Sequence, residues 1–365
     1  MPLSLDVVQT KVQVIWDWPI RLYRILNEVL MYSKGNKADK KKNSSAAAKE
    51  EEDMAATNST ADEKLNKLLE IYCSAAFAEE IHNQLRCLSV IDIFLSITAF
   101  LGNTLILVAL HKESSLNPPS KLLLRSLAAT DLCVGLISEP LHAMFKLSLV
   151  SERWNACVFA AYASTTTGFT FSGVTLLTMT AISVDRLLAL LLGLRYKHVV
   201  TLKRMRVVVI AFWLVSIAVA AVQLWNVAAL RWYSYLIIPL CLATSAFCYI
   251  KIFRTLTHLR QQTSTRPAKQ LDVARYKNAV SSSLWLQSTL VICYLPFAVV
   301  NIVVTVSTNS SQSAMPSSLF VVRMFAIVLT HLNSSLNPIL YCWKIRPVRQ
   351  AVKVTIRQVL CHLSS

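Results

Sequence analysis

Long apolar stretches recur along the chain, separated by short polar connections. A membrane-spanning helix needs about 20 mostly apolar residues, because hydrocarbon offers no partners to backbone N–H and C=O groups and the helix must satisfy them itself. The stretches that meet this requirement cover residues 88–110, 122–149, 155–184, 207–230, 232–250, 279–306 and 320–343. The pattern therefore predicts an all-α integral membrane protein, a bundle of seven transmembrane helices.

The boundary between the fourth and fifth stretches is the least marked, because only Arg231 interrupts the apolar run from Val207 to Ile250. At 1.5 Å per residue, one helix over that run would extend about 66 Å, roughly twice the thickness of a bilayer core. We therefore expect the chain to turn between residues 225 and 232.

Basic residues are concentrated in the connections on one side of the predicted bundle. That side holds 20 lysines and arginines, in residues 111–121, 185–206, 251–277 and 344–365. After residue 87, the other side has only Lys146, Arg153, Arg231 and Arg323. Such an excess marks the cytoplasmic side, which puts the N-terminus outside and the C-terminus inside a multi-pass plasma-membrane protein. Topology thus explains most of the net charge of +17, and we expect no nucleic-acid partner.

Composition agrees with a membrane location, since 54% of the residues are hydrophobic and only 16% are charged, against roughly a quarter charged in soluble domains. Three parts are predicted: an N-terminal segment over 1–87, the membrane domain over 88–343 and a cytoplasmic helix and tail over 344–365.

The N-terminal segment is expected to be extracellular and largely disordered, because residues 34–64 are rich in Lys, Ala, Ser and Glu. Apolar residues at helical spacing over 65–72 predict a short helix there. Asn43 and Asn58 each begin an Asn-x-Ser/Thr triplet, so both are candidate glycosylation sites unless the triplets arose by chance.

The C-terminal part has an apolar face at helical spacing, made of Ile345, Val348, Val352, Ile356 and Val359. Basic residues lie around the rest of this segment, which predicts an amphipathic helix on the inner leaflet in contact with membrane lipids. Cys361 follows, and either carries a palmitate or is an unmodified thiol.

A few strongly polar residues lie inside the predicted spans: Asn103 in the first, Asp131 in the second, and Asn333, Ser334 and Asn337 in the seventh. Such groups are costly in hydrocarbon, so we expect them to face the bundle interior. Their polarity alone supports two interpretations equally: hydrogen bonds that hold the helices together, or an ion or switch site.

Six short motifs occur in order in successive parts of the membrane domain. They are Gly102-Asn103, the LAATDL around Asp131, Asp185-Arg186, Trp213, Cys293-Tyr294-Leu295-Pro296 and Asn337-Pro338-Ile339-Leu340-Tyr341. One such motif is weak evidence, but six in the correct order are strong evidence. The chain from about 88 to 360 resembles the rhodopsin-like (class A) G protein-coupled receptors. A short second outer loop without cysteine is similar to the melanocortin, adenosine and cannabinoid branch, and LRYKHVVT is most similar to melanocortin receptors.

The resemblance implies a receptor, not an enzyme, that binds an extracellular ligand and activates heterotrimeric G proteins through outward movement of the sixth helix. It assigns G protein coupling and the activation switch to Asp185, Arg186, Leu194, Tyr294, Pro296, Asn337, Pro338 and Tyr341. It assigns a pocket for water and an allosteric sodium ion to Asn103, Asp131, Thr175, Asn333 and Ser334, with Asp131 as the metal-binding carboxylate. No other cofactor is expected.

The sequence also departs from the family pattern. Leu187 follows Asp185-Arg186 where the family has Tyr, and Tyr294 replaces the usual Trp. Tyr249 follows Pro239 by ten residues, more than the family spacing, so its role as a switch residue is doubtful. The usual disulfide from the third span to the second outer loop is expected to be absent. Cys73, Cys87 and Cys157 can pair among themselves, and spacing does not decide which pair forms.

The resemblance narrows the ligand, a small molecule or peptide whose identity stays open. Monoamine receptors have an Asp near the position of Gly168, and opsins have a lysine in the seventh span, where this chain has none from Met324 to Trp343. The candidate pocket residues are Glu139, His142, Thr166, Thr167, Phe171, Phe297 and Asn301. For Glu139 we expect an ion pair with Arg323 or Lys146, the alternative being contact with a cationic ligand.

Two other classes of membrane protein are alternatives. One is a receptor-like protein that does not signal. The other is a transporter, which should show inverted repeats or helices broken by Gly and Pro, and the sequence shows neither. An intramembrane enzyme would need paired acids or metal-ligand spacing, which the seven histidines do not provide.

Overall fold

The computed structural model describes residues 73, 75–114, 116–222, 227–262, 267–311 and 316–363. Every regular element in this part of the chain is helical. The predictions for the N-terminal segment up to residue 72, including the short helix and the sequons at Asn43 and Asn58, lie outside the described residues. So do the side chains of Leu194 and Cys361.

Six helices in the described ranges are long and apolar enough to cross a membrane, judged by length and composition. They lie within α3 (Ala75–Lys112), α6 (Trp154–Leu192), α8 (Leu202–Val222), α9 (Val227–Gln262), α10 (Pro267–Ser311) and α11 (Ser317–Lys344). Each contains one of the predicted spans or most of it.

The second predicted span is a helical run in three parts, α4 (Pro118–Cys133), the π-helical η2 (Val134–Ser138) and α5 (Glu139–Val150). Pro140 has no backbone N–H to donate, and a π turn just before it accommodates the missing bond. Gly135 lies within η2 where α3 comes very close: a Cβ there would lie 2.9 Å from the backbone nitrogen of Phe100. Ser96 also donates a hydrogen bond to the Gly135 carbonyl at 2.6 Å.

The predicted boundary between the fourth and fifth spans was wrong by a few residues. α8 is described to Val222 and α9 from Val227, so residues 227–230, which were predicted for the fourth span, belong to α9. Arg231, which was expected at the turn, lies within the first two turns of α9 instead.

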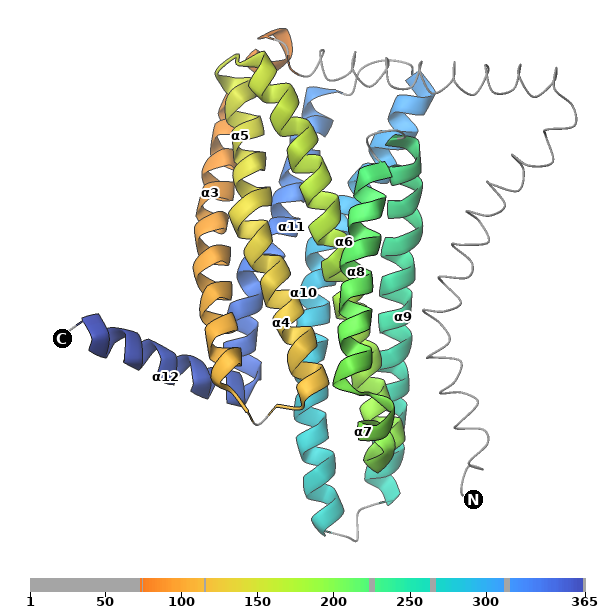
Figure 1. Cartoon of the computed structure of the whole chain (residues 1–365). Helices are drawn as coiled ribbons and strands as arrows, with labels where there is room; N and C mark the ends of the chain where they lie inside the picture. The colour runs from red at the N-terminus through yellow and green to blue at the C-terminus, as the bar shows by residue number, and fades with distance from the viewer. Residues whose placement is uncertain are drawn as a thin grey trace, which may run out of the picture. The chain divides into compact units, whose positions relative to one another are not determined.

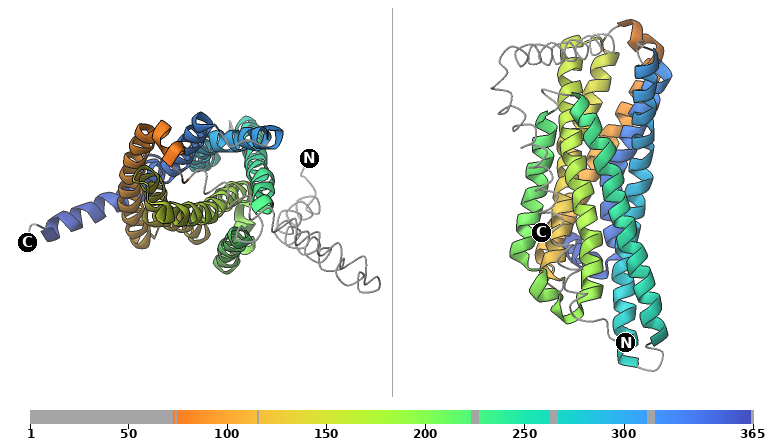
Figure 2. Two further views of the ribbon diagram at one scale, coloured as in Figure 1. Left: turned by 90° about the horizontal axis from the view of Figure 1, so that it is seen from above. Right: turned by 90° about the vertical axis from the view of Figure 1, so that its right-hand side faces the viewer.

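The helices pack around α6, which contacts α4, α5, α8, α9 and α10 (Figure 1). α3 packs against α5 and α11, and α10 packs against both α9 and α11, which closes the ring seen along the helix axes in Figure 2. In its most apolar window α6 has 56% of its residues buried, against 17% for α8. The core therefore follows α6, and α8 lies at the periphery.

Large apolar side chains cover the outward faces of the helices. Exposed examples are Val90, Phe94, Leu101, Val207, Ile210, Leu214, Ile292 and Val299. Exposed apolar surface of this extent is unfavourable in water and suits contact with lipid tails.

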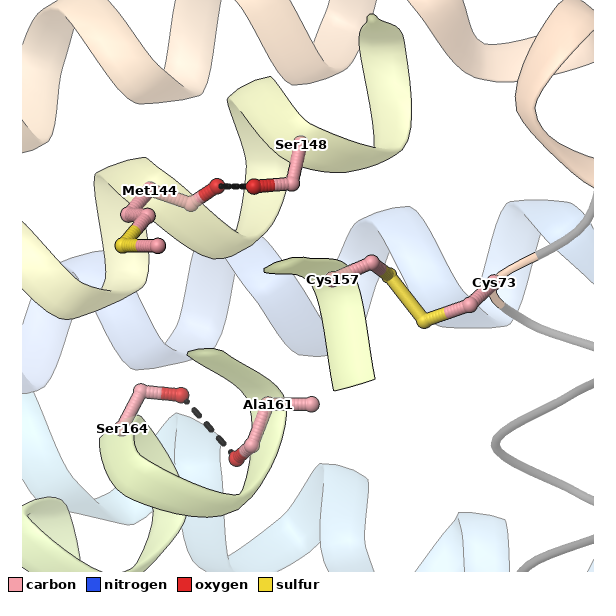
Figure 3. The surroundings of a disulfide bond; sticks show 6 residues. All are labelled: Cys73, Met144, Ser148, Cys157, Ala161 and Ser164. Atoms are coloured by element: carbon pink, nitrogen blue, oxygen red, sulfur yellow. Dashed lines mark hydrogen bonds between the residues drawn. A yellow bond between two sulfur atoms is a disulfide. The ribbon is translucent and has the colours of Figure 1, made fainter. Parts of the chain in front are cut away.

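A disulfide joins Cys73, just before α3, to Cys157 in the first turn of α6 (Figure 3). It is one of the pairings that the spacing had left open, and Cys87 is a free, exposed thiol. Below, this end of the bundle is called the disulfide end. The opposite end, where Arg186 lies in α6, is called the Arg186 end.

At the Arg186 end, η3 (Gly193–Arg195) and α7 (Tyr196–Val199) connect α6 to α8. α12 (Arg346–Leu363) follows α11 and runs sideways from the bundle (Figure 1). It contacts α3 and α11, and Lys112 at the end of α3 donates a hydrogen bond of 2.5 Å to Gln358.

Candidate functional site

The Asp185 carboxylate is the centre of a hydrogen-bond group at the Arg186 end. Arg186 donates from Nη2 to Asp185 Oδ2 at 2.7 Å, and Ser120 of α4 donates to the same oxygen at 2.9 Å. Tyr196 of α7 donates to Oδ1 at 2.5 Å. Burial and the neighbouring carboxylate raise the pKa of Tyr196, which therefore stays a proton donor at neutral pH. One buried carboxylate thus holds Arg186 and ties α4, α6 and α7 together.

Arg186 also borders a cavity of about 130 Å³ at this end. The walls come from α4, α6, α10 and the residue after α11, and they include Leu123, Ile182, Leu286 and Ile345. The guanidinium side chain keeps 21% of its surface exposed, whereas the Asp185 carboxylate keeps 1%. The arrangement presents a restrained cation beside a hollow between α4, α6 and α10.

Tyr249 of α9 lies close to this site despite its unusual distance from Pro239 in the sequence. Its hydroxyl accepts a hydrogen bond of 3.3 Å from Ser183, three residues before Arg186 on α6. Leu194, the predicted contact with the G protein, is the central residue of η3 and lies two residues before Tyr196. The structure therefore places Tyr249 across from the helix that carries Arg186.

Asp131 is fully buried in the middle of the bundle and accepts two hydrogen bonds from α11. Ser334 donates to Oδ1 at 2.8 Å and Asn337 donates to Oδ2 at 2.7 Å. Asn103 of α3 donates to the Ser334 carbonyl at 3.0 Å. The structure thus brings together four of the residues for which the sequence predicted an ion site or a switch.

The other two residues predicted for the sodium pocket, Thr175 and Asn333, are buried on α6 and α11. Neither shares a hydrogen bond with Asp131 within the described residues. The amide oxygens of Asn103, Asn333 and Asn337 are buried without a hydrogen-bond partner in the same part of the chain. Carboxylate and amide oxygens are the ligands that hard cations prefer, so the donor set fits a sodium ion.

The predicted switch residues Tyr294, Asn337 and Tyr341 of α10 and α11 are buried, and Pro296 is half-buried. Tyr294 donates a hydrogen bond of 3.4 Å to Ser172 of α6. Pro296 and Pro338 lie inside α10 and α11, where each removes one backbone hydrogen bond. Tyr341 is 1% exposed, and its hydroxyl has no hydrogen-bond partner in the described ranges.

A buried charge cluster lies in the half of the bundle toward the disulfide end. Lys146 of α5 forms an ion pair with Asp92 of α3, and both side chains are fully buried. His331 of α11 approaches the other Asp92 oxygen through Nδ1 at 3.2 Å. The His142 and His331 rings meet edge to face with centroids 4.9 Å apart. The cluster links α3, α5 and α11.

A second cavity, of about 80 Å³, lies between η2, α5, α6, α9, α10 and α11. Its polar lining includes Ser138, His142, Arg323 and His331. Its apolar lining includes Phe169, Leu176, Ile237, Ile238, Phe297 and Ile327. This combination of apolar walls with a few convergent polar groups is typical of small-molecule sites.

Comparison with known proteins identifies the family. The sequence model of the 7 transmembrane receptor (rhodopsin family) matches residues 102–231 and 225–341. The chain belongs to the rhodopsin family of seven-transmembrane receptors. The predicted class is therefore confirmed: the protein is a multi-pass membrane receptor from a family of receptors rather than enzymes.

Among similar proteins are several adenosine receptors, one of the branches that the sequence suggested. Adenosine receptor A2b of Gallus gallus is 23% identical over 312 residues, which cover 74% of this chain and 88% of the relative. Adenosine receptor A2a of Canis lupus familiaris is 23% identical over 305 residues, which cover 73% of this chain and 71% of the relative. Adenosine receptor A3 of Ovis aries is 24% identical over 304 residues, which cover 75% of this chain and 91% of the relative.

Of the ligand-pocket candidates, the receptor places only His142 and Phe297 in the lining of the smaller cavity. Thr166 and Thr167 donate their hydroxyl hydrogens to carbonyls of their own helix at 2.9 Å. Phe171 packs edge to face on Trp213 of α8, and the Asn301 amide donates to the Phe297 carbonyl at 2.9 Å. Local partners thus hold these four side chains.

The expected ion pair of Glu139 is absent from the described part of the receptor. Lys146 pairs with Asp92, and neither Glu139 oxygen has a hydrogen-bond partner among the described residues. Seven residues separate Glu139 from Lys146, which is about 10 Å along a helix and too far for direct contact. Asp92 on the adjacent helix reaches the ammonium group instead.

Sequence reasoning missed three residues in this half of the receptor: Asp92 of the buried ion pair, and Ser138 and Gly168, which line the smaller cavity. Asp92 was detectable, because it is an acid within the first apolar stretch. Ser138 and Gly168 had no such signal, since a serine and a glycine are ordinary in transmembrane helices.

Proposed function

We propose that the receptor binds an extracellular ligand in the half toward the disulfide end and activates heterotrimeric G proteins at the Arg186 end. The observation that carries the proposal is Arg186, held by Asp185 at the edge of a cavity between α4, α6 and α10. A cation restrained by one buried carboxylate can be released when the helices around it move.

We also propose that the disulfide end is extracellular and that the receptor lies in the plasma membrane. The excess of lysine and arginine at the Arg186 end supports this orientation. A disulfide at the opposite end suits an oxidising, extracellular environment. α12 then lies on the inner leaflet, with Val348 and Val352 buried and Arg349 and Lys353 exposed.

Activation is proposed to be an outward movement of the Arg186 end of α10, whose backbone is weakened at Pro296. Movement of Leu286 and its neighbours on α10 would enlarge the cavity beside Arg186. Tyr249 packs in one cluster with Val280 of α10, and Tyr341 is proposed to turn inward when α10 moves. The opened hollow would receive the G protein.

Sodium is proposed to stabilise the resting state through Asp131 and Ser334, supported by the buried oxygens around them. Replacing sodium chloride by N-methyl-D-glucamine chloride is expected to raise ligand-independent signalling of receptor-containing membranes severalfold. In Asp131→Asn the same exchange should have no effect, because the ion's carboxylate partner is gone. The rate of guanine-nucleotide exchange in membranes measures the response of the unchanged receptor and that of Asp131→Asn. Equal responses of the two proteins would contradict the sodium proposal.

The test of the function is ligand-independent signalling in cultured cells, measured as cAMP and as dissociation of each G protein class. Arg186→Ala is expected to abolish it at equal surface abundance, because the cation that faces the cavity is removed. Lys203→Ala, which removes an exposed cation of α8 at the same end, should leave it unchanged. If the intact receptor is silent, Asp185→Asn supplies an activated background. If Asp185→Asn also gives no change in cAMP and no G protein dissociation, the chain is a receptor-like protein that does not signal.

A further inference from the structure

A lysine at the end of α11 lies against two tryptophan rings at the Arg186 end. Lys344 Nζ is 3.6 Å from the ring centroid of Trp343, its neighbour on α11, and 4.6 Å from that of Trp285 on α10. The two rings are 5.2 Å apart and inclined at 55° to each other. The contact of Lys344 with Trp285 joins α11 to α10, and below it is called the α10–α11 cation contact.

The rings take the place of a carboxylate as partners of this ammonium group. Lys344 forms no ion pair within the part of the chain that the structure describes. After Asp272 the sequence contains no aspartate or glutamate at all, so α11 and α12 offer no acid to it. The face of an aromatic ring carries partial negative charge and attracts a cation, and tryptophan does so most strongly.

Both rings lie on the outer surface of the bundle, with 45% of Trp285 and 55% of Trp343 exposed. Tryptophan is common at membrane interfaces, so an exposed ring there has no further meaning by itself. The arrangement is informative, because the rings come from two different helices and share one cation. A contact of this kind depends on how far apart the two helices are.

A hydrogen bond joins the same two segments. Ser282, three residues before Trp285 on α10, donates to the Lys344 carbonyl at 3.1 Å. This carbonyl is one of the last four of α11, which have no partner within their own helix. Residues three apart lie on the same side of a helix. Ser282 and Trp285 therefore hold one turn of α10 against the end of α11.

The turn of α10 that is held in this way also borders the cavity beside Arg186. Ser282 and Leu286 line that cavity, and so does Ile345, the residue after Lys344. Movement of this turn away from α11 would open the cavity and break the α10–α11 cation contact in the same step. The contact is present while Arg186 is restrained, so it stabilises that conformation.

We propose that Trp285 and Lys344 are positioning residues for activation, because their contact holds the Arg186 end of α10 in its resting position. This contact acts in addition to the Asp185 carboxylate, which restrains Arg186 itself. The proposal rests on the proposed function for its effect on signalling, but the position of α10 is measurable without a G protein.

The first measurement is ligand-independent signalling in cells at equal surface abundance, made in Asp185→Asn if the intact receptor is silent. Lys344→Gln and Trp285→Leu are each expected to raise it about threefold, because an exposed cation–π contact contributes little free energy. Lys344→Arg keeps a cation over the rings and should signal like the parent receptor. The two substitutions together should raise signalling no further than one of them, because both remove the same contact.

Lys251→Gln is the matched control. Lys251 Nζ lies 5.9 Å from the centroid of the Phe247 ring, so this substitution also removes a cation from an aromatic ring. Both residues belong to α9, and their contact does not join two helices. Lys251→Gln should therefore signal like the parent receptor.

The second measurement is the position of α10 in purified full-length receptor in lipid nanodiscs, without G protein. Spin labels on Leu284→Cys of α10 and Arg206→Cys of α8 report the distance between these helices, with Cys87→Ser removing the exposed native thiol. Both helices pack on α6, so outward movement of α10 lengthens this distance. Lys344→Gln and Trp285→Leu should increase the fraction of receptors with the longer distance, and Lys344→Arg should not.

Three results overturn the proposal: Lys344→Gln leaves the distance unchanged, Lys344→Arg behaves like Lys344→Gln, or the effects of Lys344→Gln and Trp285→Leu add in the double variant. Failure of the proposed function gives a different result. A longer distance in Lys344→Gln without any Arg186-dependent signalling would refute G protein coupling and leave the role of the contact standing. Arg186-dependent signalling that Lys344→Gln does not change would refute the role of the contact alone.

Discussion

Asp92→Ala is expected to lower the free energy of unfolding by about 3–5 kcal/mol. The substitution leaves the Lys146 ammonium fully buried without its carboxylate partner, and it also removes the acceptor for His331. An uncompensated charge inside the bundle costs far more than a lost surface pair. Thermal unfolding in detergent and surface abundance in cells measure the effect.

Two control variants separate the buried charge from other causes. Asp92→Leu combined with Lys146→Met removes both charges, and such apolar replacement of a buried pair is often neutral, so most of the stability should return. Glu80→Ala removes an exposed acid that accepts a hydrogen bond of 2.5 Å from Ser317, and it should cost less than about 1 kcal/mol. If Asp92→Ala unfolds like the unchanged receptor, the buried ion pair does not stabilise the fold.

Asp185→Asn is expected to raise ligand-independent signalling about fivefold. The substitution removes the negative charge that restrains Arg186. Because Ser120 and Tyr196 donate to different oxygens of Asp185, the amide oxygen can keep only one of these two hydrogen bonds. Hydrogen bonds to charged groups contribute about 1.5–3 kcal/mol. Because Arg186 is partly exposed, we use about 1 kcal/mol, which is about fivefold in a two-state equilibrium.

Tyr196→Phe is the matched comparison, because it removes one hydrogen bond from the same carboxylate and leaves its charge. Its effect on ligand-independent signalling should be smaller than that of Asp185→Asn. Adding Arg186→Ala to Asp185→Asn should return signalling to background. An Asp185→Asn receptor with unchanged or lower activity at equal surface abundance would show that this carboxylate does not restrain Arg186.

The helical spans were predictable because the bilayer allows few solutions. A chain in hydrocarbon must satisfy its backbone within each helix, so the apolar stretches coincide with the helices that the structure contains. The errors lie where composition changes little. The end of α8 at Val222 and the start of α9 at Val227 fall inside one apolar run, and no hydropathy pattern marks the turn between them.

The sequence predicted the neighbours of a candidate-site residue correctly where both residues belong to one short motif within a single helix. Asp185 and Arg186 are adjacent, and Ser334 and Asn337 lie on one face of α11, so their sites followed from the sequence. Pairings across helices were not predictable. Lys146 contacts Asp92 rather than Glu139, and Cys157 pairs with Cys73. These contacts depend on how neighbouring helices are rotated, which no spacing within a single segment determines.

The most direct test of the account uses purified receptor in lipid nanodiscs with purified heterotrimeric G proteins of each class. The measured quantity is the rate of guanine-nucleotide exchange on the G protein, with Asp185→Asn as the activated receptor. The account predicts faster exchange on at least one G protein, and a return to the uncatalysed rate when Arg186→Ala is added. Exchange that stays at the uncatalysed rate with every G protein, or that is accelerated equally without Arg186, would contradict it.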